Sequence, residues 1–250
     1  MTLQKHIVII GATSGMAEQC ARLWLQAEPI RLTLVGRNRE KTEAVAADLR
    51  VRNPACVIES MTADFLDVAS IRATVDAVVQ QGSPDIVLIA QGTLPDQAEC
   101  QTELTLCRDT LEINGISPVL FAEAFAGPME QANHGTLAII GSVAGDRGRK
   151  SNYVYGSAKG MVSRYAEGLQ HRLARSKVKV VLIKPGPTDT PMTASFKAKG
   201  MKMAPVNEVA REIVAAVDKG KAVAYVPGKW WFIMRVIQHL PAIIFNRLDI

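Results

Sequence analysis

Short runs of apolar residues alternate with longer amphipathic stretches along the whole chain. The apolar runs are rich in Val and Ile, and most of them do not alternate with polar residues. Strands that are apolar at successive positions are expected in a parallel sheet whose two faces are both covered. We predict strands over 7–10, 32–35, 57–61, 86–90, 137–140, 178–183 and 222–226.

The stretches between these runs carry apolar residues at helical spacing. The predicted helices cover 17–27, 40–51, 70–80, 105–115, 118–131, 152–175 and 207–219. Strands and helices in alternation predict right-handed βαβ units. We therefore expect one α/β domain over residues 1–228, built on a doubly wound parallel sheet of about seven strands with helices on both faces. Residues 229–250 form an appended tail.

Composition and charge narrow the function classes. The chain has 250 residues, of which 48% are hydrophobic and 21% charged, which is typical of a globular protein and excludes disorder. Its four cysteines are scattered, with no Cys/His cluster that predicts a metal site, so we expect a reduced, cytoplasmic chain. The apolar run 7–10 is too short for a signal peptide. A net charge of +5 is mild, and we expect no nucleic-acid partner.

The first predicted strand runs into a glycine-containing turn, and a helix follows at once. Glycine lets the backbone approach a pyrophosphate closely, and a helix N-terminus offers free N–H groups and the positive end of its dipole. A plain strand–helix turn has the same composition, but its position in an α/β chain favours a dinucleotide site. The residues expected to bind the cofactor here are Gly11, Thr13, Ser14, Gly15 and Met16.

Residues after the second and third strands bear on the choice of cofactor. An acidic residue after the second strand would bind the adenosine ribose of NAD, but Arg37 and Asn38 stand there. A guanidinium suits a 2′-phosphate, which favours NADP(H) over NAD(H); a solvated surface arginine is the alternative. Asp64 either accepts a hydrogen bond from the adenine amino group or caps the next helix, and Phe65 beside it completes this group.

A tyrosine and a lysine four residues apart are the strongest catalytic signal. Tyr155 and Lys159 share one face of a predicted helix, and Ser142 ends the strand before it. A nearby cation favours the phenolate, so Lys159 is expected to lower the pKa of Tyr155 and make it a general acid/base. The Ser142 hydroxyl is placed to hydrogen-bond a substrate carbonyl oxygen.

In this order, the motifs resemble the short-chain dehydrogenase/reductase family over residues 5–227. The resemblance implies a single Rossmann-fold domain and an NAD(P)-dependent oxidoreductase. The family's catalytic residues fall on Asn114, Ser142, Tyr155 and Lys159. The family's Asn-Asn-Ala-Gly motif is the main departure, since only its glycine remains in Ile89-Ala90-Gln91-Gly92. Further cofactor contacts implied by the family fall on Ala90, Gly92, Pro185, Gly186, Thr188 and Thr190.

The resemblance also implies a mechanism. Tyr155 donates a proton to a carbonyl oxygen as hydride arrives from NADPH, and Ser142 orients that oxygen. Lys159 holds the nicotinamide ribose and lowers the tyrosine pKa. Asn114 fixes a water through its main chain and relays protons to Lys159.

Two basic segments are expected at the mouth of the substrate cleft. The loop before Tyr155 contains Arg147, Arg149 and Lys150, and the lid of the family runs from Met192 to Met203. The lid mixes Phe196 and methionines with Lys197, Lys199 and Lys202, which suits an anionic, lipid-bearing substrate; a solvated loop is the alternative. With the tail, the segments 147–150 and 197–202 hold nine of the 29 basic residues and one acid, Asp249.

The tail has an apolar stripe at helical spacing. Trp230, Ile233, Met234, Ile237, Leu240, Ile244 and Leu248 form this stripe, and basic or polar residues lie on the other side. Pro241 breaks or kinks the helix. The pattern is typical of an interfacial segment on a bilayer, which would place the protein at the inner face of the membrane. Contact with another subunit is the alternative, because the family commonly forms homo-oligomers, as dimers or tetramers.

The tail and several loops are also similar to the reductases that act on the 2-keto intermediate of decaprenylphosphoryl-arabinose synthesis. The segments that carry this likeness are 11–15, 91–96, 142–159 and the tail. We therefore expect an NADP(H)-dependent reductase of a small-molecule or lipid-linked carbonyl substrate, with a lipid-linked sugar phosphate as one candidate. An NAD-using alcohol dehydrogenase of the same family and a non-catalytic NADP-binding regulator are the alternatives.

Overall fold

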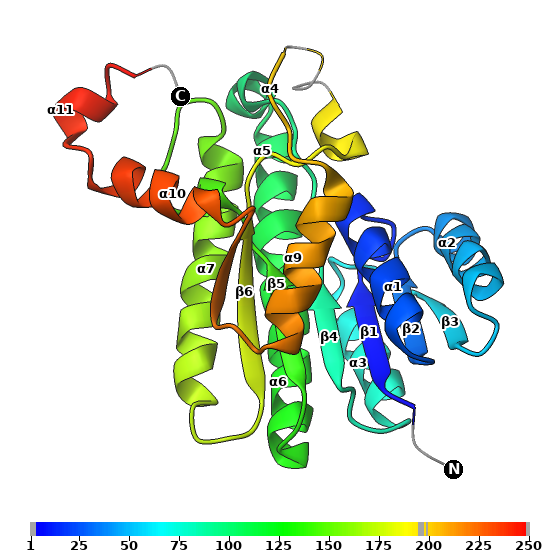
Figure 1. Cartoon of the computed structure of the whole chain (residues 1–250). Helices are drawn as coiled ribbons and strands as arrows, with labels where there is room; N and C mark the ends of the chain where they lie inside the picture. The colour runs from blue at the N-terminus through cyan, green and yellow to red at the C-terminus, as the bar shows by residue number, and fades with distance from the viewer. Residues whose placement is uncertain (1–3, 195–197, 199, 249–250) are drawn as a thin grey trace.

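The computed structural model describes residues 4–194, 198 and 200–248. A seven-stranded sheet lies at its centre in the order β3-β2-β1-β4-β5-β6-β7, and every neighbouring pair is parallel (Figure 1). The strands are β1 (His6–Ile10), β2 (Arg31–Gly36), β3 (Val57–Thr62), β4 (Ile86–Ile89), β5 (Thr136–Ile140), β6 (Lys179–Pro185) and β7 (Val223–Val226). All seven predicted strands are confirmed, with ends that shift by one or two residues.

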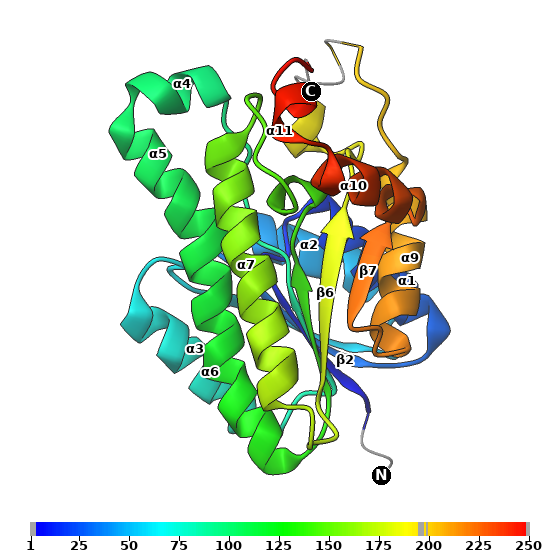
Figure 2. The same ribbon diagram turned by 90° about the vertical axis from the view of Figure 1, so that its left-hand side faces the viewer.

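Helices cover both faces of this sheet. The main ones are α1 (Gly15–Ala27), α2 (Arg39–Arg52), α3 (Val68–Val79), α5 (Leu104–Leu111), α6 (Ser117–Ala132), α7 (Tyr153–Arg172) and α9 (Val206–Asp218). Figure 2 shows α3, α5, α6 and α7 on one side of the sheet, with α1 and α9 on the other. The doubly wound arrangement predicted from the alternation of elements is therefore confirmed.

The continuous apolar strands have a direct structural explanation. Ile7 and Ile9 of β1 belong to a core layer completed by α1, α2 and α9. Val8 and Ile10 point to the other face, into a layer completed by α3, α6 and α7. Because both faces are covered, neither set of positions tolerates polar residues, and the strand shows no alternation.

The segment from 97 to 116 differs from the prediction. A short helix that we did not predict, α4 (Gln97–Thr102), begins where the Asp96 carboxylate accepts a hydrogen bond from the Ala98 N–H at 2.8 Å. The helix predicted over 105–115 ends at Leu111 and continues as a π-helical turn, η1 (Glu112–Ile116), directly into α6. Hydrophobic spacing does not distinguish a π-turn from an α-helix over five residues.

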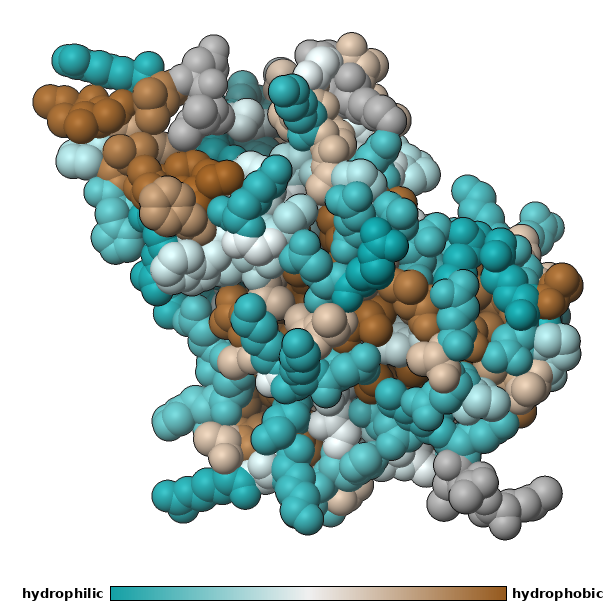
Figure 3. Space-filling view, in the orientation of Figure 1, coloured by the Kyte–Doolittle hydropathy of each residue, from teal (hydrophilic) through white to brown (hydrophobic). Residues whose placement is uncertain are grey.

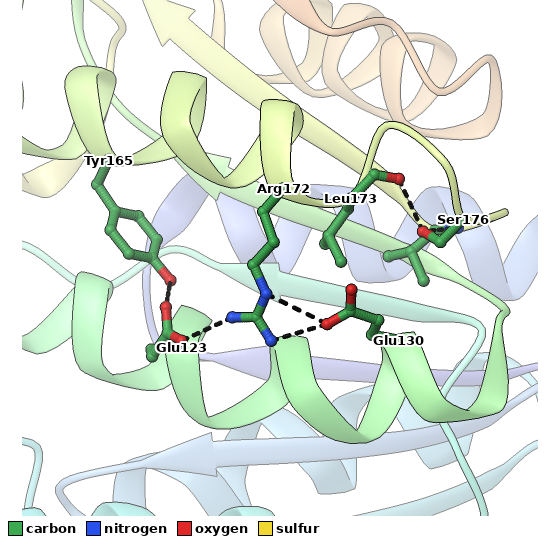
Figure 4. A network of polar contacts seen from close by, with 7 residues as sticks. Glu123, Glu130, Tyr165, Arg172, Leu173 and Ser176 are labelled. Carbon is green, nitrogen blue, oxygen red and sulfur yellow. Dashed lines mark hydrogen bonds and ion pairs between the residues drawn. The ribbon is translucent and has the colours of Figure 1, made fainter.

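Charged contacts join α6 to α7 along their outer side (Figure 4). The Arg172 guanidinium pairs with Glu123 and Glu130 at 2.8 Å each, and the Tyr165 hydroxyl donates to Glu123 at 2.6 Å. These groups are largely solvent-exposed, so each contact contributes little on its own, but together they hold α7 against α6.

The tail folds as two helices and does not present its predicted stripe to solvent. Helices α10 (Lys229–His239) and α11 (Ala242–Phe245) are separated by Pro241, as expected. Met234 of the stripe is fully buried, whereas Trp231 and Phe232 on the opposite side are 52% and 67% exposed. The prediction that the stripe 230–248 faces outward is therefore wrong over α10, because this side covers the end of the sheet (Figure 2).

A single arginine anchors the tail to the domain. The Arg147 guanidinium donates to the carbonyl oxygens of Ile237 at 2.5 Å and Leu240 at 2.7 Å, at the C-terminal end of α10. It also stacks on the ring of Phe245, 3.7 Å from the centroid. Cations bind well at helix C-termini, where carbonyls lack partners. Arg147 was expected at the substrate mouth, but it holds the tail instead.

Within residues 4–194, 198 and 200–248, no helix is both long enough and apolar enough to cross a bilayer.

Candidate active site

A cavity of about 420 Å³ opens at the carboxyl ends of the central strands. In doubly wound sheets, this edge is where ligands bind. The predicted residues that line the cavity are Ser14, Met16, Ala90, Gly92, Ser142, Tyr155, Lys159, Pro185, Gly186, Thr188 and Thr190. They come from the ends of β1, β4, β5 and β6 and from the starts of α1 and α7, so distant parts of the chain meet at one hollow.

Ser142 and Tyr155 are brought together by a close contact between two backbones. Ser142 begins the turn η2 (Val143–Gly145), and its hydroxyl oxygen accepts the Ala144 N–H at 3.1 Å. A Cβ on Gly145 would lie 2.6 Å from the Lys159 main chain, and one on Gly156 would lie 2.9 Å from the Ala144 carbonyl oxygen. Only glycine allows this approach, which places the Ser142 hydroxyl in hydrogen-bonding contact with Tyr155.

Lys159 is 2% exposed and reaches across to the end of β5. Its ammonium donates to the carbonyl oxygen of Ile140 at 3.0 Å and lies 5.9 Å from the centre of the Tyr155 ring. Burial disfavours the charged form and lowers the pKa of Lys159 from 10.5 to about 8. Its other N–H donors remain available for hydroxyl groups in the cavity.

The pKa of Tyr155 shifts in the direction opposite to our expectation. Burial raises the pKa of the phenol, and the hydrogen bond with Ser142 only partly offsets this. Lys159 is not among the groups that lower it, since its ammonium lies nearly 6 Å away, bound to Ile140. The prediction that Lys159 lowers the Tyr155 pKa is thus wrong, and Tyr155 holds its proton at neutral pH.

Asn114 lies beside this group but does not line the cavity. It is fully buried within the π-turn η1, where its amide donates to the Thr110 carbonyl at 2.9 Å and accepts the Thr93 N–H at 2.9 Å. A Cβ on Gly92 would lie 2.8 Å from the Asn114 side-chain oxygen and 3.8 Å from the Lys159 ammonium. Because Gly92 has no side chain, the Asn114 side-chain oxygen and the Lys159 ammonium can both lie close to it. The proposed water relay stays a prediction.

The turn after β1 fits a pyrophosphate. Gly11 has φ +82°, and a Cβ there would lie 2.5 Å from the Gln91 main-chain nitrogen, so no other residue fits. Ser14 precedes α1 without capping it, and no side chain within the described part of the chain binds the N–H groups of its first turn. These N–H groups and the helix dipole therefore face the cavity, as anion binding requires. Thr13 is exposed in the same turn.

The residues predicted to bind the adenosine half of the cofactor lie outside the cavity, and the structure bears differently on each of them. Arg37 is exposed directly after β2, with no acidic partner within the described residues. The Asn38 side chain accepts the Lys41 N–H at 2.9 Å and so caps α2. The suggestion that Asp64 caps the next helix is wrong, since Asp67 caps α3 and Asp64 accepts the Leu66 N–H. The Phe65 side chain packs in the core against Phe121, and its cofactor contact stays a prediction.

The segment after β6 lies over the start of α1. Thr190 approaches Gly15, because a Cβ on that glycine would lie 3.5 Å from the Thr190 methyl group. The Thr188 hydroxyl donates to the Gly186 carbonyl at 2.9 Å, and the Thr188 carbonyl oxygen accepts the Thr193 hydroxyl at 2.5 Å. Of the predicted lid, Met192, Met201, Lys202 and Met203 line the cavity. Phe196, Lys197 and Lys199 lie outside the described residues.

Several lining residues were not singled out from the sequence. Trp230 of the tail lies directly on Gly186, where a Cβ would overlap the indole ring. Arg149, Ser151 and Asn152 line the side of the cavity next to Tyr155. The basic loop indicated Arg149 as one of three cations, but no pattern in the sequence separates it from Arg147.

Comparison with known proteins agrees with this geometry. The sequence model of the short chain dehydrogenase family matches residues 5–200. An uncharacterized oxidoreductase of Streptomyces coelicolor is 26% identical over 244 residues, which cover 98% of this chain and 96% of that protein.

Solved structures share the fold along nearly the whole chain. A short chain dehydrogenase from Burkholderia cenocepacia, in complex with NADP, has a TM-score of 0.83 at 18% identity, and the match covers 99% of this chain and 98% of that one. The actinorhodin polyketide ketoreductase with NADPH has a TM-score of 0.81 at 22% identity, covering 91% and 97%. At these identities the likeness concerns the fold.

Burial of Lys159 predicts how stability depends on pH. Its pKa is about 8 in the folded protein and 10.5 when free, so the folded state loses this proton first as the pH rises. The unfolded state then binds more protons, and stability from this group increases between those pH values. We expect the free energy of unfolding of the wild type, relative to Lys159→Met, to rise by about 3 kcal/mol from pH 7 to pH 11 in urea titrations.

Lys219→Met is the matched control, because it removes a solvent-exposed lysine at the end of α9. A difference between wild type and Lys159→Met that stays flat or falls across this pH range would contradict a desolvated ammonium at Lys159.

Proposed function

The chain belongs to the short-chain dehydrogenase family, and on this basis we propose that it is an NADPH-dependent reductase that converts a carbonyl to a secondary alcohol. The chain is an NAD(P)-dependent oxidoreductase by family. The observation that supports reduction is a single cavity containing Ser142, Tyr155 and Lys159 next to the uncapped start of α1. A phenol that keeps its proton at neutral pH suits the donation of that proton to a carbonyl oxygen.

Each residue then has a separate task. The bound cofactor supplies hydride to the carbonyl carbon. The Ser142 hydroxyl and the Tyr155 phenol line the cavity side by side, where both can reach a substrate carbonyl oxygen. Ser142 orients this oxygen, and Tyr155 protonates it. Lys159 offers its remaining N–H donors to ribose hydroxyls.

Arg37 supports the choice of NADPH. It follows β2 at the position where NAD-binding proteins carry an acid, and it is exposed and without an acidic partner in the described chain. The solved relatives from Burkholderia cenocepacia and the actinorhodin pathway hold NADP or NADPH, which is in keeping with this proposal. NAD use within the same family is the alternative.

A non-catalytic regulator is the second alternative, and the intact Ser142–Tyr155–Lys159 group speaks against it. For the substrate, the lipid-linked sugar phosphate of the subgroup that the tail and loops resemble is one compound of the proposed class. The relatives named above do not single out that subgroup.

Tyr155→Phe tests the proposed chemistry. Removing the hydroxyl removes the proton donor, so we expect NADPH oxidation with a panel of ketones to fall by about 10³-fold or more. The Kd for NADPH should change by less than about threefold, because the ring stays in place. Oxidation of NADPH at the wild-type rate by Tyr155→Phe would overturn the assignment.

Arg37→Gln tests the cofactor. Loss of a charge-assisted contact to the 2′-phosphate should weaken NADPH binding by about tenfold or more, while the Kd for NADH stays within about twofold. Arg175→Gln, which removes an exposed arginine in the turn after α7, controls for net charge. Equal Kd values for NADPH and NADH in the wild type would contradict a contact between Arg37 and the 2′-phosphate.

We also propose that the outer face of the tail lies on an anionic membrane surface. Trp231, Phe232, Val236, Ile243 and Ile244 form this outer face, and Figure 3 shows the brown patch that the tail presents. Lys229, Arg235 and Arg247 lie among them. A two-fold contact between copies would bring these three cations against themselves, whereas an anionic bilayer complements them.

Vesicle flotation tests this surface. Vesicles with phosphatidylglycerol should carry the wild type, whereas those of phosphatidylcholine alone should carry it at least about tenfold less. Phe232→Glu with Ile243→Glu should lose flotation, and Val51→Glu, an equally exposed apolar residue on α2, should keep it. Unchanged flotation of the double variant would contradict the membrane proposal.

Homo-oligomerisation is a separate proposal, and the same variants test it by light scattering. A wild-type mass of a single chain would contradict it. If the double variant becomes monomeric and the wild type does not float, the outer face is a subunit contact.

A further inference from the structure

The walls of the active-site cavity carry positive charge and no counter-charge. Arg149, Lys159 and Lys202 line it, and no aspartate or glutamate does so among the residues that the structure describes. Lys159 belongs to the catalytic group, and Lys202 comes from the exposed lid segment. Arg149 is different, because it projects from the loop between η2 and α7, on the same side as Ser142 and Tyr155.

Arg149 has no partner within the described chain. Its Nε is buried and makes no hydrogen bond, and no ion pair involves its guanidinium. Burial lowers the pKa of Arg149, and the nearby Asp146 only partly opposes this. The terminal nitrogens of the guanidinium stay accessible, and a guanidinium that is partly removed from water without a partner gains from binding an anion.

The acid nearest to Arg149 in sequence is already engaged. The Asp146 carboxylate pairs with the Lys184 ammonium at 2.5 Å and accepts the Tyr225 hydroxyl at 2.8 Å, and its side chain is 1% exposed. Both of its oxygens therefore have partners other than Arg149. Asp146 balances Lys184, and Arg149 is left with its charge unpaired at the cavity.

A second polar group beside Arg149 is also unsatisfied. The side-chain oxygen of Asn152 is buried without a donor, although Asn152 precedes α7 and does not cap it. Arg149, Ser151 and Asn152 line the same cavity as Tyr155, from the loop that precedes α7. Arg149 also borders a second hollow of about 340 Å³ between the loop and the tail residues Phe245 and Leu248.

The location separates this group from the cofactor's phosphates. The turn that fits a pyrophosphate lies at the start of α1, with Thr188 and Thr190 over it. Arg149 lies instead at the side of the cavity formed by the loop before α7. We infer that Arg149 binds an anionic group, a carboxylate or a phosphate, on the carbonyl substrate, which makes it a specificity-determining residue. This inference deepens the proposed reductase function and rests on it.

Matched pairs of ketones test the inference. The probes are 3- and 4-acetylbenzoate, each against its neutral amide, and 4-acetylphenyl phosphate against 4-methoxyacetophenone. Calorimetric titration into NADP-loaded protein measures affinity without turnover. We expect the wild type to bind at least one anion at least about tenfold more tightly than its neutral partner.

Arg149→Gln should reduce this ratio of anion to neutral affinity at least about tenfold, and Arg175→Gln should keep it. Preference for the benzoates or for the phosphate identifies which anion fits. Equal affinity within every pair, or an unchanged ratio in Arg149→Gln, overturns the inference. So does a loss of NADPH affinity in Arg149→Gln with the ratio unchanged, which would assign the guanidinium to the cofactor.

Turnover of the same pairs separates this inference from the proposed function. Reduction of both members of every pair with equal kcat/KM would support the reductase function and contradict the anion site. Selective binding of the anions without NADPH oxidation by any ketone would support the anion site and contradict the reductase function.

Discussion

The turn after β5 lies backbone against backbone on α7, and the geometry of the active site depends on this contact. A side chain at Gly145 or Gly156 would come within 3 Å of main-chain atoms on the opposite segment, so either would push the turn and the helix apart. Ser142 precedes this contact, and Tyr155 and Lys159 lie within the first turns of α7. The contact thus brings three separate positions in the sequence to one place, where Ser142 and Tyr155 are hydrogen-bonded to each other. The Lys159 bond to Ile140 closes the same unit from the sheet side.

Burial, more than charge pairing, sets the chemistry of this unit. It lowers the pKa of Lys159 and raises that of Tyr155, so each group is pushed toward its neutral form. A neutral phenol is an acid that can protonate an oxygen. A lysine with a pKa of about 8 keeps its proton more readily when a ligand accepts hydrogen bonds from its charged form. The cavity is therefore prepared for a ligand that brings hydroxyl groups and negative charge.

The basic loop before α7 divides its charges among three tasks. Asp146 stays inside with Lys184, Arg147 turns to the C-terminal end of α10, and Arg149 remains at the cavity. Because Arg147 holds the tail and Trp230 of the tail covers Gly186, the tail forms part of the wall of the active site. Its outer side remains apolar and basic. One helix therefore links the substrate cavity to the surface that we propose for membrane contact.

Local patterns in the sequence determined the elements and the catalytic spacing, because strand and helix periods are properties of neighbouring residues. The seven strands followed from continuous apolar runs, and the four-residue step from Tyr155 to Lys159 placed both on one face of α7. Tertiary structure decided everything that depends on burial or on partners distant in the chain. Only the fold shows that Phe65 packs in the core, that Arg147 binds the tail while Arg149 lines the cavity, and that the α10 part of the predicted outer stripe faces inward. The fold also reversed the expected shift of the Tyr155 pKa, because neighbouring residues in the sequence do not determine how deeply a phenol is buried.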